Sequence, residues 1–158
     1  MSRAFTSEGQ NDSGLADIGE RTVSPHRNLV TAEGLAAIDA EIARLREDLA
    51  KAEADADREK IALHSRDLRY WNARRETAEL SVPEADSDVV RFGMRVTIED
   101  EDGERKTWRI VGEDEADAAH GTISHVSPMA QALFGKKIGD TGTVNGREWE
   151  ILALEAPH

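Results

Sequence analysis

The chain has 158 residues, of which 39% are hydrophobic and 33% are charged, and its formal net charge at pH 7 is −12. No apolar run approaches the roughly 20 residues that cross a membrane, and the absence of cysteine excludes disulfides and thiolate metal sites. The acid excess argues against broad nucleic-acid binding, because a surface that binds phosphates needs a basic excess.

The N-terminal residues 1–28 are rich in Ser, Gly, Asn, Asp and Glu and show little hydrophobic periodicity. This composition predicts a mobile tail. The tail also lacks the apolar core of a secretory signal peptide. We therefore expect the protein to remain in the cytoplasm.

Residues 29–80 show the pattern of two helices that pack along their length. Thr31 is a good N-cap, and Glu33 lies in the first turn, where an acid is favourable. A heptad seam follows, made of Leu35, Ile38, Ile42, Leu45 and Leu49 and continued by Ala52 and Ala56. A second apolar stripe contains Ile61, Leu68, Trp71 and Ala78, with Pro83 beyond its end. The pattern predicts an antiparallel helical hairpin that turns between Glu53 and Lys60.

Neither Gly nor Pro marks the turn, so a single helix over residues 32–80 is an alternative. Such a helix would leave its apolar seam in need of a second chain, as in a coiled-coil dimerisation protein. A hairpin satisfies the seam within one chain, and on this reading we expect a monomer.

A linker over residues 81–90 precedes a small α+β domain over residues 91–158. Its expected strands are Met94–Ile98, Thr107–Val111, Ile123–Val126, Thr141–Val144 and Glu148–Leu154, and Asp102-Gly103 and Asn145-Gly146 are hairpin-turn signals. Ser127 and Pro128 begin a helix that runs to Phe134. Residues 81–158 carry 16 acidic and 8 basic side chains, so their expected partner is a basic or mixed protein surface.

Several sequence blocks occur in one order in this domain: V-G-E-D-E-A-D at residues 111–117, G-T-I-S at 121–124, S-P-M-A-Q-A-L at 127–133 and G-K-K-I-G-D at 135–140. They resemble the C-terminal domain of the bacterial GreA/GreB transcript-cleavage factors, from about Arg91 to Glu155. Leu29-Val30-Thr31 is similar to the family's opening, although the hairpin is shorter than the family pattern. The resemblance implies an FKBP-like domain and a transcription elongation factor that binds RNA polymerase and reaches nucleic acid only through the elongation complex.

The resemblance also implies a docking surface on the C-terminal domain. Its residues would be Asp114, Glu115, Ser127, Pro128, Met129, Ala130 and Leu133. They would form an apolar concavity for a coiled coil of the polymerase near its secondary channel, and Met and Pro beside small residues suit adaptable docking. The alternative is that the helix only covers the sheet, with Ala130 and Leu133 turned inward.

At the hairpin tip, the resemblance implies acids that help hold a second Mg²⁺ at the polymerase's own active site. The acids here are Asp55, Asp57 and Glu59, and carboxylates are the hard oxygen ligands that Mg²⁺ prefers. The family's acid spacing and its nearby aromatic are missing, so ordinary solvated charges are the alternative. We expect no metal site or cofactor of the protein's own, since no histidines pair at zinc spacing.

Two functions compete within this resemblance. One is an accessory factor, not itself an enzyme, that stimulates transcript cleavage by the polymerase. The other is a non-cleaving regulator of the Rnk kind, which has a short hairpin and competes with Gre factors. A prolyl isomerase is a third reading, because FKBP-like folds include such enzymes. Against it, Phe92, Trp108, Phe134 and Trp149 are expected to be core residues, which leaves few aromatics for a pocket.

Overall fold

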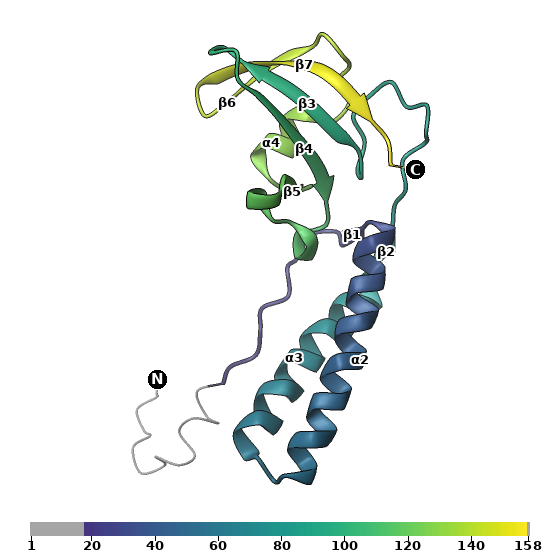
Figure 1. Ribbon diagram of the computed structural model, residues 1–158, viewed down its shortest axis with the longest axis vertical. Helices are drawn as coiled ribbons and strands as arrows, with labels where there is room; N and C mark the ends of the chain where they lie inside the picture. Colours follow the sequence, from purple (N-terminus) through teal and green to yellow (C-terminus); the bar gives the residue numbers. More distant parts are fainter. Residues whose placement is uncertain (1–17, 158) are drawn as a thin grey trace. The chain divides into compact units, whose positions relative to one another are not determined.

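The computed structural model describes residues 18–157. Residues 1–17 of the mobile tail predicted over residues 1–28 therefore lie outside the described residues. The chain divides into two compact units: one contains residues 36–77 with the segment before residue 26, and the other contains residues 26–35 and the chain from residue 78 onward. The predicted fold class, a helical hairpin followed by an α+β domain, is confirmed (Figure 1).

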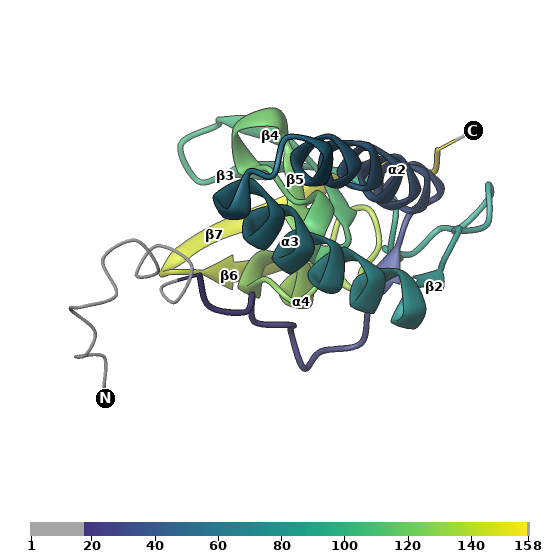
Figure 2. The ribbon, with the colours of Figure 1, turned by 90° about the horizontal axis from the view of Figure 1, so that it is seen from below.

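The first unit is built on the helices α2 (Ala32–Ala54) and α3 (Arg58–Thr77), which run side by side (Figures 1 and 2). Three residues, Asp55–Asp57, connect them, so the turn lies within the predicted range and the single-helix alternative is wrong. Ala56 has φ of 53°, which is a left-handed conformation that reverses the chain without a glycine.

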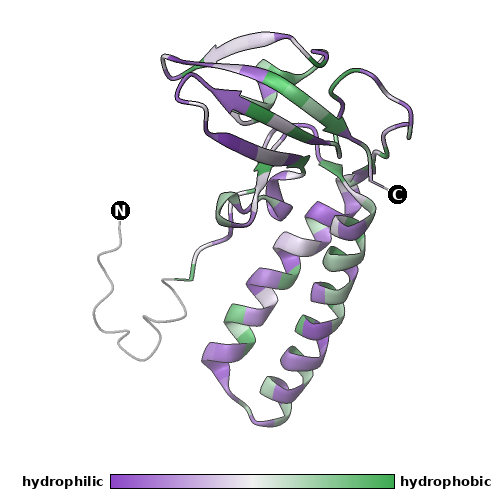
Figure 3. Cartoon of the chain, turned by 45° about the horizontal axis from the view of Figure 1, so that its top comes forward, coloured by the Kyte–Doolittle hydropathy of each residue, from purple (hydrophilic) through white to green (hydrophobic). Residues whose placement is uncertain are grey.

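The heptad seam of α2 is where the hairpin is buried. Ile38, Ile42, Leu45 and Ala52 are buried, and Leu35 and Leu49 are half-buried. The stripe of α3 is less well covered, because Ile61, Leu68 and Trp71 are only half-buried. Both helices alternate between hydrophobic and hydrophilic residues along their length (Figure 3). The buried apolar contacts of the hairpin therefore come mainly from the stripe on α2.

Two short strands that flank the hairpin in sequence pair in parallel with each other: β1 (Leu29–Val30) and β2 (Glu79–Leu80). The N–H of Glu79 donates to the carbonyl of Asn28 over 2.8 Å, and the N–H of Ser81 donates to that of Val30 over 3.0 Å. Both strands belong to the second unit, together with the first turn of α2. The sequence pattern did not predict this pairing, because two-residue strands carry no periodicity.

The second unit contains a five-stranded sheet with the order β5-β4-β3-β7-β6. Its strands are β3 (Arg95–Asp100), β4 (Arg105–Val111), β5 (Thr122–Ser124), β6 (Thr141–Val144) and β7 (Arg147–Glu155). All neighbours are antiparallel except β4 and β5. Gly103 and Asn145-Gly146 have positive φ, as the predicted hairpin turns require. All five predicted strands are present, although β5 ends at Ser124 and not at Val126.

Helix α4 (Pro128–Leu133) covers one face of this sheet (Figure 1). The core between them contains Val90, Phe92, Val96, Ile98, Ile110, Ile123, Ala130, Leu133, Trp149 and Ile151. Of the four aromatics expected there, Phe92 and Trp149 are buried, while Trp108 and Phe134 pack against the core from half-buried positions. No helix within residues 18–157 is long and apolar enough to cross a membrane.

Leu45→Ala should destabilise the hairpin, because Leu45 is 1% exposed and losing a buried Leu side chain costs about 2–5 kcal/mol. Thermal unfolding followed by circular dichroism measures the effect. Leu63→Ala on α3 is the matched control, because Leu63 is 38% exposed and its loss should cost little. Equal destabilisation by the two changes would contradict the assignment of the seam. A melting temperature that rises with protein concentration would show that the seam pairs between chains.

Candidate functional site

The start of α4 is set by its first residues, as the sequence predicts. The Ser127 hydroxyl accepts a hydrogen bond from the N–H of Ala130 over 3.2 Å, and Pro128 occupies the first turn. After the helix ends at Leu133, Gly135 adopts φ of 80° and its N–H donates to the carbonyl of Val90 over 3.1 Å. Ser127 thus caps the start of the helix, and Gly135 binds the chain just beyond its end to Val90.

The docking residues expected on α4 divide between core and surface. Ala130 and Leu133 are fully buried in the sheet core, so their side chains lie out of reach of a partner. Pro128 is exposed, and Met129 is half-buried with part of its side chain against the core. Of the α4 residues expected to dock, Pro128 and Met129 therefore offer surface.

Asp114 and Glu115 lie in a 3₁₀ turn, η1 (Glu113–Glu115), which follows β4. The carboxylate of Glu115 accepts hydrogen bonds from the N–H of Thr31 over 3.0 Å and from that of Gly112 over 3.1 Å, and also from the Thr31 hydroxyl. The same hydroxyl accepts from the N–H of Gly34 over 2.9 Å, so Thr31 is the predicted N-cap of α2. Glu115 thus binds the start of α2 within the second unit.

The close approach of Glu115 explains a glycine inside a helix. A Cβ on Gly34 would lie 2.2 Å from the Cδ of Glu115. An acid at this position also faces the positive end of the helix dipole.

Within the same unit, Arg109 pairs with Glu33 over 3.1 Å and donates to the carbonyl of Gly93 over 3.1 Å. The Arg109 hydrogen bond lowers the pKa of Glu33, which keeps this carboxylate charged.

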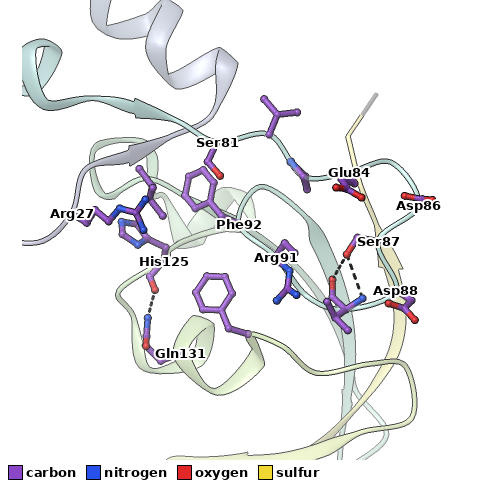
Figure 4. A pocket seen from close by; sticks show the side chains of 15 residues that line it. Arg27, Ser81, Glu84, Asp86, Ser87, Asp88, Arg91, Phe92, His125 and Gln131 are labelled. Atoms are coloured by element: carbon purple, nitrogen blue, oxygen red, sulfur yellow. Dashed lines mark hydrogen bonds between the residues drawn. The ribbon is translucent and has the colours of Figure 1, made fainter.

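A hollow of about 830 Å³ opens beside α4 in the second unit (Figure 4). Its walls come from β1 and the chain just before it, the segment between β2 and β3, and α4 with the residues on either side of that helix. The lining residues are Arg27, Leu29, Ser81, Val82, Pro83, Glu84, Asp86, Ser87, Asp88, Val89, Arg91, Phe92, His125, Gln131 and Phe134. None of the docking residues expected from the sequence lines this hollow. Sequence reasoning missed it because its walls are separated by up to about a hundred residues along the chain.

His125 forms the polar floor of the hollow. Its ring packs edge-on against Phe92 at a centroid distance of 5.6 Å, and Gln131 Nε2 donates to its backbone carbonyl over 2.7 Å. Burial lowers the pKa of His125, so the ring is neutral at neutral pH. With Phe92 and Phe134 on the walls and acids along the segment of residues 84–88, the hollow offers apolar contact beside negative charge.

At the hairpin tip, the structure gives the three acids different surroundings. Asp57 caps α3: its carboxylate accepts from the N–H of Lys60 over 3.2 Å, and the Lys60 ammonium lies 3.9 Å from it. Asp55 and Glu59 are exposed. Residues 18–157 contain no group of three Asp, Glu or His side chains that could hold a metal ion.

The C-terminal half of the chain, residues 85–156, matches the family described as "Transcription elongation factor, GreA/GreB, C-term". A transcription elongation factor GreA from Ruegeria pomeroyi is 36% identical over 151 residues, covering 80% of this chain and 96% of the relative. The chain belongs to the GreA/GreB family. A GreA from Bradyrhizobium diazoefficiens is 46% identical over 81 residues, covering 48% of this chain. The chain spans about half the length of the Bradyrhizobium relatives that it matches.

Among solved structures, the GreA factor homolog Gfh1 of Thermus thermophilus is 23% identical, with a TM-score of 0.40 and coverage of 83% of this chain and 100% of that one. The family's members matched here carry the name of transcription elongation factors. The roles of the individual docking and tip residues stay predictions.

Gly34→Ala should destabilise the protein even though Gly to Ala in a helix normally stabilises it. The added methyl group displaces the Glu115 carboxylate, which loses charge-assisted hydrogen bonds worth about 1.5–3 kcal/mol each against a propensity gain of about 0.5–1 kcal/mol. We expect a net loss of roughly 1 kcal/mol or more in urea unfolding. Gly19→Ala is the control, because a Cβ there meets nothing within 4 Å. An unchanged or higher stability of Gly34→Ala would show that Glu115 does not hold the start of α2.

Proposed function

We propose that this protein is an elongation factor that binds RNA polymerase at its secondary channel and acts on paused or backtracked complexes by stimulating the polymerase's own transcript cleavage. In this proposal it works as a cytoplasmic monomer and meets nucleic acid only through the elongation complex. The observation that carries the proposal is the match to a GreA that extends over 96% of the relative's length and so includes the hairpin region.

The surface around the exposed start of α4 supports a docking role for the second unit. Pro128 and Met129 present apolar atoms there, and residues 81–158 have a net charge of −8, which favours a basic or mixed protein partner. Asp114 lies in the 3₁₀ turn that follows β4. Glu115, Ala130 and Leu133 support this surface from within, because their side chains are engaged in the chain itself.

The exposed acids Asp55 and Glu59 are the proposed carboxylates of the tip. The magnesium ion belongs to the polymerase, and each acid would add one oxygen ligand to an ion that keeps several waters. Asp57 has a positioning role, because it caps α3. The arms of 23 and 20 residues extend roughly 34 and 30 Å at 1.5 Å per residue. The relatives reported above are GreA proteins, which favours a Gre-type function over a Rnk-like one.

Three forms of the protein, tested on purified backtracked elongation complexes, check this proposal. The parent should accelerate transcript cleavage. The Asp55→Asn/Glu59→Gln variant should bind polymerase as the parent does but leave cleavage at the rate of polymerase alone, because amides are poor magnesium ligands. Pro128→Asp should lose both binding and stimulation, because it places a charge on the apolar docking surface.

Circular dichroism melting provides the control, and an acid in the first turn of α4 should leave the fold intact. A parent that does not bind polymerase would contradict the proposal. A parent that binds and slows the cleavage stimulated by another Gre factor would show that the non-cleaving, competing function is the correct one.

A further inference from the structure

The segment of residues 18–25 lies against α3 within the first unit, although it has no helix or strand of its own. Glu20 forms a two-pronged ion pair with Arg69, with distances of 2.8 Å to Nε and 2.5 Å to Nη2. Arg21 pairs with Asp67 over 3.5 Å, and its guanidinium lies 3.9 Å from the centroid of the Tyr70 ring. Two consecutive residues thus bind three positions of α3.

These contacts are suited to release. The side chains of Glu20 and Arg69 are 62% and 57% exposed, and exposed ion pairs are weak and screened by salt. When the segment leaves, Asp67 keeps a partner, because Arg66 also donates to it over 2.9 Å. Tyr70 keeps its edge-on packing against Trp71 at 5.1 Å. Detachment therefore exposes no unpaired buried charge and leaves the packing of α3 intact.

The segment of residues 18–25 contacts α3 at some distance from the hairpin tip. Asp67 and Arg69 lie 9 and 11 residues beyond the first residue of the helix, Arg58, which corresponds to roughly 14 to 16 Å from the tip end. Residues 58–66 of α3, which lie nearer the tip, carry none of these contacts. From Asp67 onward, the segment adds a third piece of chain to the cross-section of a two-helix hairpin.

We propose that residues 18–25 are an autoinhibitory strap, which binds Asp67, Arg69 and Tyr70 of α3 and opposes entry of the hairpin into RNA polymerase until it is released. This inference rests on the proposed function. The bound strap widens the hairpin where it must enter a channel. Release of the strap breaks only the ion pairs that Glu20 and Arg21 form at the surface. A competing contact or moderate salt therefore suffices to detach it.

The strap itself is tested with a spin label, without polymerase. The chain has no cysteine, so Val23→Cys takes one nitroxide at a strap residue that is 41% exposed. With no other change, the electron paramagnetic resonance spectrum should show that the motion of the label is restricted. Adding Glu20→Gln and Arg21→Gln should make the label mobile, and raising the salt concentration should do the same. Arg44→Gln is the matched control, because it removes exposed pairs with Glu41 and Asp48 on α2, away from the strap.

Polymerase binding is then measured with the same unlabelled variants. At low salt, Glu20→Gln/Arg21→Gln should bind polymerase about two- to fivefold more tightly than the parent, the range that weak exposed pairs allow. The difference should disappear at high salt, and Arg44→Gln should bind as the parent does. Conversely, Glu20→Cys/Arg69→Cys joined by a short bis-maleimide should bind more weakly than the same protein before cross-linking.

The outcomes separate the strap from the proposed function. A label that is already mobile in the parent overturns the strap. A label that is released by the variant while all forms bind polymerase equally overturns its autoinhibitory role and leaves the proposed function standing. If no form binds polymerase, the proposed function fails, and the inhibitory role fails with it.

Discussion

The carboxylate of Glu115 joins the turn after β4 to the first turn of α2 by accepting hydrogen bonds from Gly112 and Thr31. Gly34 must lack a side chain for this approach, and Thr31 caps the helix beneath it. Arg109, on the strand β4 that leads into the same turn, adds a second contact through its ion pair with Glu33. Because of these contacts, α2 begins inside the sheet-bearing unit, so the helix start depends on residues more than seventy positions away.

Periodicity predicted the parts of the fold that regular patterns encode. Ile38, Ile42 and Leu45 lie on the buried stripe of α2, and Asn145-Gly146 turns between β6 and β7. The pairing of β1 with β2 could not be predicted in this way, because two residues show no alternation. The turn at Asp55–Asp57 could be placed only within a range, since Ala56 takes the left-handed conformation that glycine usually marks.

The candidate site was harder to predict because one residue type serves two purposes. An acid in the block of residues 111–117 can lie on a surface that binds a partner, or it can accept hydrogen bonds from groups within the domain. Glu115 accepts hydrogen bonds from backbone N–H groups within its own unit, whereas Asp114 lies in the same 3₁₀ turn without a part in those bonds. Likewise, Ala130 and Leu133 share a helix with Pro128 but face the core. Burial and hydrogen bonding therefore separate the side chains that hold the domain together from those that remain on its surface.

The role of Glu115 at the start of α2 is tested most directly by a double-mutant cycle between Thr31→Val and Glu115→Ala, followed by urea unfolding. If the carboxylate holds the start of α2 through Thr31, the two changes together should cost less than the sum of their separate costs, with a coupling of about 1 kcal/mol or more. Costs that add to within about 0.5 kcal/mol would contradict the claim, because independent sites behave in that way.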